Sequence, residues 1–324
     1  PWVNVRTLLT FLAALAVFAP GARAASTASP YLVVLGIAQD AGYPQAGCAK
    51  ACCKLAWKDA SSRRFPTSIG LVDPVSGGRW IFDCTPSFPA QLRLLDDFSK
   101  SEETPGLAGI FLTHAHIGHY AGLIHLGREV IGSRSVPVYA MPRMKSFLEQ
   151  NGPWSQLVKL NNIAIRPLAA DKAIRLNERL SVTPFLVPHR DEFSETVGFR
   201  IDGPKQAVLF IPDIDKWKKW PRQIEDALKQ VDAAYLDGTF YAEGELPNRS
   251  MAEIPHPFIA ESMRRFEKLP AGERNKVRFI HLNHTNPALQ TNSAARAEIE
   301  RSGMHVAEQG ERLDLTTGKF LKRR

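Results

Sequence analysis

Three histidines within six residues, placed after an apolar segment, constrain this chain more than any other feature. The apolar residues GIFLT predict a buried strand that ends at Thr113, and the residues HAHIGH follow it directly. Residues two apart on an extended backbone share a face, so His114 and His116 can point at one position. The apolar spacing that follows predicts a helix over 117–131, with His119 in its first turn. Only nine histidines occur among 324 residues, so this crowding is typical of a metal site.

The first residues have the pattern of a secretory signal peptide. Arg6 supplies a short basic region, residues 8–18 are apolar, and Ala22-Arg23-Ala24 gives a small-x-small cleavage pattern. The apolar segment is short for a bilayer span, so an uncleaved anchor is the weaker interpretation. We therefore expect a signal peptide over 1–24 and a periplasmic or secreted protein, without stable membrane insertion after signal removal.

Residues 25–324 are long enough for one large α/β domain, and no low-complexity segment divides them. The apolar patterns predict strands over 31–37, 68–72, 79–82, 109–113, 136–140, 163–167, 180–187, 197–201, 207–211, 233–236, 277–281 and 313–316. They predict helices over 88–98, 117–131, 143–150, 221–230, 256–268 and 292–302. Two strand-rich halves with interleaved helices predict a two-sheet α/β sandwich.

The net charge of +8 comes from scattered basic pairs and a basic C-terminal tail. Nucleic-acid binding would favour a concentrated basic stripe with aromatic platforms. We therefore expect no nucleic-acid partner and a small-molecule substrate, for which the charge fits an anion without excluding a neutral compound. Nothing in the sequence specifies an oligomeric state.

Cys48, Cys52 and Cys53 lie within six residues, in a segment flanked by glycine and proline that we expect to be a loop. Export would favour a disulfide, whereas the crowding favours a structural zinc ion. Adjacent Cys52 and Cys53 are poorly placed to pair with each other, so a disulfide would use Cys48 or Cys84. Both alternatives stay open, and Cys84, which follows an apolar strand, is most simply a buried core residue.

Further metal-ligand residues occur where other predicted strands end. His189 follows the strand predicted over 180–187, Asp213 follows the apolar strand over 207–211, and His281 and His284 lie at the end of the strand over 277–281. A single histidine or aspartate at a strand end is most often structural. Together with the first three histidines, however, these residues suggest two metals joined by a bridging carboxylate.

The order His-x-His-x-x-His, a later His, a later Asp and a last His resembles the metallo-β-lactamase fold hydrolases. Gly42-Tyr43-Pro44-Gln45 before the cysteines, with LDGTF from Leu236 and FIHLN from Phe279, is similar to the pyrroloquinoline quinone biosynthesis protein B (PqqB) family. The segment HLNH from His281 also resembles the phosphodiesterases of the superfamily. The resemblance covers about residues 31–320 and implies an αββα sandwich of two mixed β-sheets flanked by helices.

The resemblance also implies a role for each motif residue. One metal would be held by His114, His116 and His189, a second by His119 and His281, and Asp213 would bridge them. Asp83 would orient the histidine loop. His284 would contact substrate or relay a proton, and His256 would either protonate the leaving group or be a turn histidine between two prolines.

One position departs from the family pattern. Relatives usually carry aspartate in His-x-His-x-Asp-His, and this chain has Gly118 there. The second metal would then be weakened, be absent, or take its carboxylate from elsewhere, for which Asp40 and Asp191 are the candidates.

We expect a secreted metal-dependent hydrolase in which metal-bound hydroxide attacks a small phosphodiester or related ester. Asp213, His256 and His284 are the expected catalytic residues, and the cofactor is one or two zinc ions, with iron or manganese as alternatives. The competing interpretations are a PqqB-like iron-dependent oxygenase or redox enzyme, a β-lactam or lactone hydrolase, and an accessory binding protein.

Overall fold

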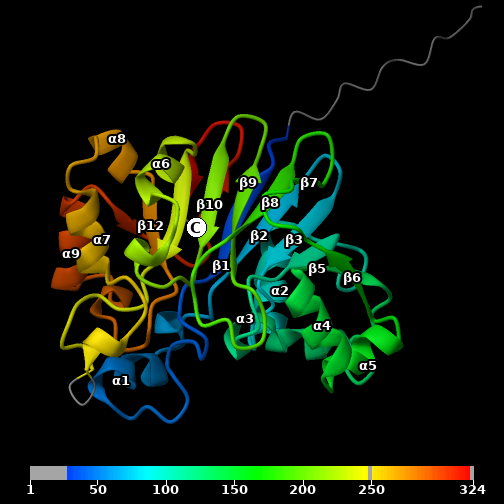
Figure 1. The fold of residues 1–324 in the computed structure, drawn as a ribbon. Coiled ribbons are helices and arrows are strands. Elements are labelled where there is room, and N and C mark those ends of the chain that lie inside the picture. The colour runs from blue at the N-terminus through cyan, green and yellow to red at the C-terminus, as the bar shows by residue number, and fades with distance from the viewer. Residues whose placement is uncertain (1–27, 247–249, 322–324) are drawn as a thin grey trace, which may run out of the picture.

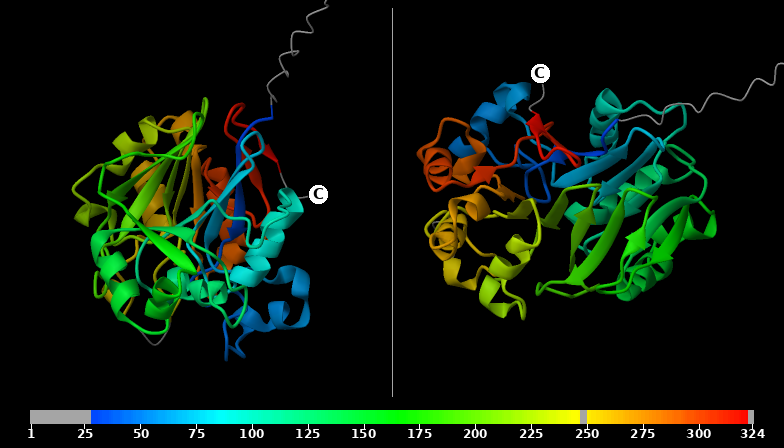
Figure 2. Two further views of the ribbon diagram at one scale, coloured as in Figure 1. Left: turned by 90° about the vertical axis from the view of Figure 1, so that its right-hand side faces the viewer. Right: turned by 90° about the horizontal axis from the view of Figure 1, so that it is seen from above.

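The computed structural model describes residues 28–246 and 250–321, and the predicted signal peptide lies outside the described residues. Two β-sheets pack face to face, and helices lie outside them, as Figures 1 and 2 show. Aromatic side chains fill the space between the sheets: the ring of Phe82 in one sheet lies 5.4 Å from Phe199 and 6.2 Å from Phe210 in the other. The predicted αββα sandwich is confirmed.

The larger sheet has eight strands in the order β15-β14-β1-β2-β3-β4-β5-β6. In chain order its strands are β1 (Tyr31–Gly36), β2 (Ser68–Asp73), β3 (Gly78–Phe82), β4 (Gly109–Phe111), β5 (Val136–Ala140), β6 (Ile163–Pro167), β14 (Arg312–Asp314) and β15 (Phe320–Leu321). Pairing is antiparallel from β15 to β3 and parallel from β3 to β6, so the sheet is mixed.

The smaller sheet has seven strands in the order β13-β12-β11-β10-β9-β8-β7. They are β7 (Ile174–Arg175), β8 (Ser181–Leu186), β9 (Val197–Asp202), β10 (Ala207–Ile211), β11 (Ala233–Asp237), β12 (Val277–Ile280) and β13 (His305–Val306). Strands β10 to β13 are parallel and β7 to β10 antiparallel. Loops that follow parallel strands gather at one edge of a sheet, and the candidate site is built there.

The helices are α1 (Ala51–Lys58), α2 (Phe88–Phe98), α3 (Ile117–Tyr120), α4 (Pro142–Gln150), α5 (Trp154–Lys159), α6 (Ile224–Lys229), α7 (Ile259–Phe266), α8 (Ala271–Arg274) and α9 (Ala294–Arg301). Helix α7 shows why such segments pack on a sheet, because it buries Ile259, Ser262, Met263 and Phe266 along one face. Among the described residues, no helix is both long and apolar enough to cross a bilayer.

Two predicted elements differ from the structure by more than a few residues at their ends. The helix predicted over 117–131 ends as α3 at Tyr120 and continues as a 3-10 turn over 121–126. The backbone N–H of Cys84 donates to the His119 carbonyl (2.8 Å) and the Gly122 N–H donates to the Cys84 carbonyl (2.9 Å), so this segment bonds to a distant loop instead of extending the helix. The cysteine segment, expected to be a loop, contains helix α1, with Cys52 and Cys53 in its first turn.

Candidate metal centre

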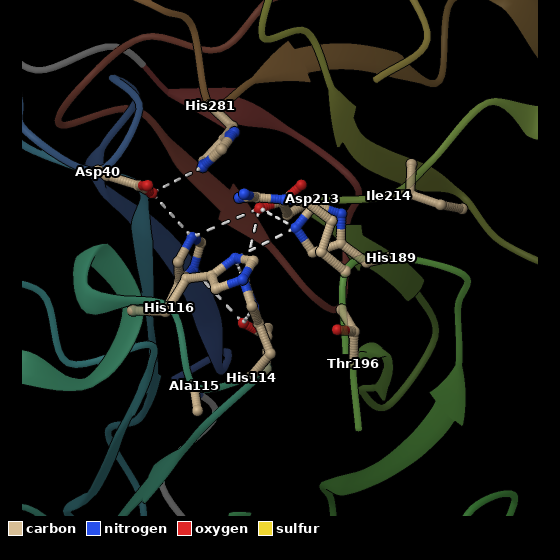
Figure 3. Close-up of polar contacts among 12 residues, drawn as sticks. Asp40, His114, Ala115, His116, His189, Thr196, Asp213, Ile214 and His281 are labelled. Atoms are coloured by element: carbon tan, nitrogen blue, oxygen red, sulfur yellow. Dashed lines mark hydrogen bonds and ion pairs between the residues drawn. The ribbon is translucent and has the colours of Figure 1, made fainter. Parts of the chain in front are cut away.

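Four donor atoms from three strand ends converge at the edge of the sandwich (Figure 3). His114 and His116 follow β4, His189 follows β8, and Asp213 follows β10. His116 Nδ1 lies 2.8 Å from His114 Nε2 and 3.2 Å from His189 Nε2. Asp213 Oδ2 lies 3.4 Å from His114 Nε2 and 3.2 Å from His189 Nε2. We call these four residues the first group.

The first group fits a divalent cation. Three imidazole nitrogens and a carboxylate oxygen face one another, and the lone pairs of neutral imidazoles would repel unless a proton or a cation lies between them. Tetrahedral zinc with bonds of 2.0–2.1 Å keeps its donor atoms roughly 3.3 Å apart, close to the observed separations. The residues present therefore match the ligand set that zinc prefers.

A second group lies beside the first and consists of Asp40, His119 and His281. Asp40 Oδ1 lies 3.1 Å from His119 Nε2 and 3.3 Å from His281 Nε2. Asp213 Oδ2 is 3.9 Å from His119 Nε2, so the same carboxylate reaches both groups. The two groups together are called the histidine cluster, and they contain all six residues predicted to hold the two metals of the active site, together with Asp40.

Asp83 orients the loop that carries the first three histidines. Asp83 is fully buried and its Oδ2 lies 2.6 Å from His119 Nδ1. The backbone N–H of Thr113 donates to Asp83 Oδ1 (2.8 Å), and the Thr113 hydroxyl lies 2.9 Å from His114 Nδ1. These contacts leave the Nε2 atoms of both imidazoles to face the donor groups.

Three outer contacts escaped sequence reasoning. Glu192 Oε2 lies 2.9 Å from His116 Nε2, Asp215 Oδ1 lies 3.4 Å from His189 Nδ1, and the Thr239 hydroxyl lies 2.9 Å from His281 Nδ1. Metal-bound histidines commonly donate their other ring N–H to such partners. The only sequence signal was proximity, since Glu192 follows His189 by three residues and Asp215 follows Asp213 by two.

His256 lies against the carboxylates of the site and is 5% exposed. Its Nδ1 is 2.8 Å from Asp237 Oδ2 and 3.2 Å from Asp213 Oδ1. Asp237 is itself held by donation from the Thr239 hydroxyl (2.7 Å) and the Ile214 N–H (3.1 Å). The structure thus places the predicted His256 beside the bridging aspartate, in a His–Asp pair.

The electrostatics of the cluster favour bound cations. Burial alone would lower the pKa of His189, but the Asp213 carboxylate outweighs it and raises that pKa to about 10. Burial would raise the pKa of Asp213, yet His189 and His256 hold it well below its usual range. The pKa of His119 is raised well above its usual value because Asp83 and Asp40 outweigh the effect of burial. A cation bound at the cluster would displace the protons of His189 and His119, whereas burial lowers the pKa of His114 and keeps its imidazole neutral.

The cysteines form a separate group together with a histidine that the sequence assigned elsewhere. Cys48 Sγ lies 3.7 Å from Cys52 Sγ, and His284 Nδ1 lies 3.7 Å from Cys52 Sγ and 3.4 Å from Cys53 Sγ. All four cysteines of the chain are free, and 3.7 Å is far longer than a disulfide bond. We call Cys48, Cys52, Cys53 and His284 the cysteine cluster.

The cysteine cluster has the composition and spacing of a structural zinc site. With Zn–S bonds of about 2.3 Å, a tetrahedral site keeps its donors roughly 3.5–3.8 Å apart. His284 belongs to this group and to neither group of the histidine cluster. Its placement favours a ligand role over the predicted role as a substrate contact or proton relay.

Of the two candidates for the missing carboxylate, only one lies at the site. Asp191 Oδ1 accepts a hydrogen bond from the Thr196 hydroxyl (2.8 Å) and belongs to no donor group. Asp40 is a member of the second group.

The fold and the paired donor groups define a metallo-hydrolase type of site at the edge of a two-sheet sandwich. A family model for the beta-lactamase superfamily domain matches residues 79–298, and the chain belongs to that superfamily. Within it the chain is similar to coenzyme PQQ synthesis protein B of Methylorubrum extorquens, with 25% identity over 313 residues that cover 88% of this chain and 100% of the relative. The corresponding protein of Ruegeria pomeroyi is 27% identical over 309 residues, which cover 86% and 98%.

Solved structures show the same fold. Zinc-bound PqqB from Methylobacterium extorquens aligns with a TM-score of 0.74 at 23% identity, over 88% of this chain and 100% of that structure. A diphosphatase of the PhnP family aligns with a TM-score of 0.61 at 22% identity, over 91% and 99%.

Proposed function

We propose that this protein is a metal-dependent hydrolase of small phosphodiesters or related phosphate esters. The observation that carries the proposal is the pairing of two donor groups around one shared carboxylate, Asp213. Sites with two metals a few ångströms apart clamp the attacking and leaving oxygens of a displacement at phosphorus or carbon. A purely structural site has no need of a second donor group.

The two groups would hold zinc ions, which when bound would lower the pKa of a water from 15.7 to about 7 and polarise the substrate oxygen. The protein itself supplies the positions. Asp213 holds the two groups in register, the Glu192 carboxylate orients the His116 imidazole, and Asp215 places a second carboxylate 3.4 Å from His189. His256, held by Asp237, lies next to Asp213 and is the residue we propose as proton donor to the leaving group.

Two further observations support a phosphorus ester as substrate. A diphosphatase is among the proteins with this fold, and the segment HLNH resembles the superfamily's phosphodiesterases. Arg190 follows the ligand His189 directly and is exposed, so its guanidinium can meet an anionic substrate at the rim.

The second candidate is a PqqB-like oxygenase or redox enzyme that uses iron. It is favoured by the similarity to PQQ synthesis proteins over 86–88% of the chain. The two candidates differ in oxygen dependence: iron-dependent oxidation stops under anaerobic conditions, whereas hydrolysis continues.

We also propose zinc as the metal of the histidine cluster, a structural zinc ion in the cysteine cluster, and a periplasmic or secreted location. The zinc-bound neighbour and the two donor sets support the metals. The location rests on the N-terminal sequence pattern and is tested by fractionating cells that express the full chain.

The test of function compares hydrolysis of bis-p-nitrophenyl phosphate and nitrocefin by the zinc-loaded protein. We expect turnover of the phosphodiester, and a fall of at least about 1000-fold on His116→Ala, because a ligand of the first group is lost. His125→Ala is the matched control, since that partly buried histidine lies outside both groups. Turnover of nitrocefin alone would shift the function to a lactam hydrolase, and oxygen-dependent activity with iron would favour the second candidate.

A further inference from the structure

The glycine inside the histidine motif lies against another carboxylate-bearing residue. A Cβ atom built on Gly118 would lie 2.4 Å from both Cα and Oδ1 of Asp40, and 2.5 Å from its Cβ. Such distances are far inside van der Waals contact, and two of the three atoms belong to the body of Asp40 and cannot swing aside. The space that an aspartate side chain at position 118 would enter is already filled by Asp40.

Asp40 also makes the contacts expected of a metal-binding carboxylate. Its Oδ1 faces His119 Nε2 at 3.1 Å and His281 Nε2 at 3.3 Å, and the side chain is about one-third exposed. The two imidazoles come from different sheets, one after β4 and the other after β12. Two histidines alone would give the second metal too few donors. The Asp40 carboxylate raises the number of donor residues to three.

The backbone holds Asp40 in place. The N–H of Gln39 donates to the Leu282 carbonyl (2.8 Å), and the N–H of Leu282 donates to the Ile37 carbonyl (2.8 Å). The N–H of Gly42 closes a turn onto the Gln39 carbonyl (2.7 Å), with Gly42 at a φ of 75°. The segment after β1 is therefore fixed to the residue that follows His281, so Asp40 and His281 keep their separation.

We propose that Asp40 is the carboxylate ligand of the second metal, transferred from the histidine motif to the loop after β1, and that Gly118 is required because Asp40 occupies its side-chain space. The metal bound there is a divalent cation such as zinc. The inference rests on the proposed metal centre but concerns metal binding alone, so it is tested separately from the substrate.

The transfer has a consequence for the charge of the site. Asp40 and Asp213 together place two carboxylates among the five histidines of the histidine cluster. An ordinary motif aspartate would give the same count, so the relocated ligand keeps the charge that two divalent cations need.

The experiment counts metals per chain by mass spectrometry after dialysis against limiting zinc, with zinc affinity measured by chelator competition. Asp40→Asn keeps the size of the side chain and removes its charge, and Asp40→Ala removes the ligand. Both are expected to lose one zinc per chain, or at least 10-fold in affinity, while the first group and the cysteine cluster keep theirs. Asp191→Ala is the matched control and is expected to keep every metal.

A reciprocal exchange makes the test sharper. Gly118→Asp alone is expected to destabilise the protein because its side chain collides with Asp40. The double variant Asp40→Gly with Gly118→Asp restores the ordinary motif and is expected to recover the lost zinc. Full zinc content with unchanged affinity in Asp40→Ala and Asp40→Asn would overturn the proposal, and so would a double variant that remains one zinc short. Metal counts that follow the proposal in a protein without phosphodiesterase activity would refute the function and leave the role of Asp40 intact.

Discussion

The histidine cluster and the cysteine cluster are close in sequence, since His284 lies three positions after His281 and Cys48 lies eight positions after Asp40. The cysteine cluster has four donors around one point, which is the full set for tetrahedral zinc, and its cysteines lie on and just before helix α1. The histidine cluster has seven donor residues in two groups that share a carboxylate. The cysteine cluster would serve one metal, whereas the histidine cluster would divide its seven donors between two metals joined by Asp213.

The difference explains how neighbouring metal sites can have separate roles. A closed site stabilises the fold outright, and here it would tie the segment after β1 to the segment after β12. The same two segments carry Asp40 and His281. The cysteine cluster therefore supports the second group of the histidine cluster from outside.

The largest effect is expected where both groups of the histidine cluster meet. Asp213→Asn keeps the shape of the bridging residue but removes its charge, so both metals should weaken and turnover should fall by at least about 1000-fold. Activity and zinc content per chain are the measurements. Retention of both zinc ions by this variant would contradict the bridging role.

Zinc binding is expected to release protons from both clusters, and this effect comes next in size. Burial raises the pKa of the Cys53 thiol to about 12, and Asp213 outweighs burial to raise the pKa of His189 to about 10, so both are protonated at pH 7 without metal. Zinc must displace these protons, so its affinity for both clusters should rise between pH 6 and pH 8, by about tenfold per pH unit for each proton released. Calorimetry in buffers of different ionisation enthalpy measures the number of protons that each bound zinc ion releases. A pH-independent affinity would contradict the protonated state of either cluster.

A smaller effect is expected from the outer contact of the first group. Glu192→Gln weakens the hydrogen bond from His116 Nε2, and loss of such partners commonly lowers metal affinity by 10–100-fold. We expect a loss near 10-fold, because the Glu192 side chain is 44% exposed. Glu195→Gln, whose carboxylate accepts from the Arg143 N–H, is the control, and an equal loss there would remove the special role of Glu192.

The smallest effect on activity is expected from the cysteine cluster. Cys53→Ser should remove one zinc per chain and lower the melting temperature, because the segment after β1 loses its anchor. With zinc in excess, turnover should fall by less than about tenfold, since the ligands of the histidine cluster remain. Cys84→Ala removes a thiol outside the cluster and should keep all zinc, whereas loss of every metal in Cys53→Ser would show that the two clusters are one unit.

Much of the fold was predictable from local pattern. Helix α2 and strands β5 and β6 have the predicted bounds, because their apolar spacing and flanking residues are decided within the segment. The predicted helix over 117–131 failed because Cys84, more than 30 residues earlier, takes the backbone hydrogen bonds that would have continued it. No local pattern contains that information.

For the site too, the sequence predicted what depends on local pattern and missed what depends on contacts between distant segments. The histidine motif and the strand-end positions of His189, Asp213 and His281 were visible because a strand end is a local feature. The choice between Asp40 and Asp191 was not visible, since it depends on which loop approaches Gly118 in space. The position of His284 was missed because its contacts are with cysteines more than 230 residues away.

The central claim is that two metals bind around Asp213 and a third binds at the cysteines. Crystals grown with zinc and measured at the zinc absorption edge test it most directly. We predict three anomalous peaks per chain: two about 3.5–4 Å apart on either side of Asp213, and one among the cysteines and His284. A single peak at the cysteine cluster, with none among the histidines, would contradict the account.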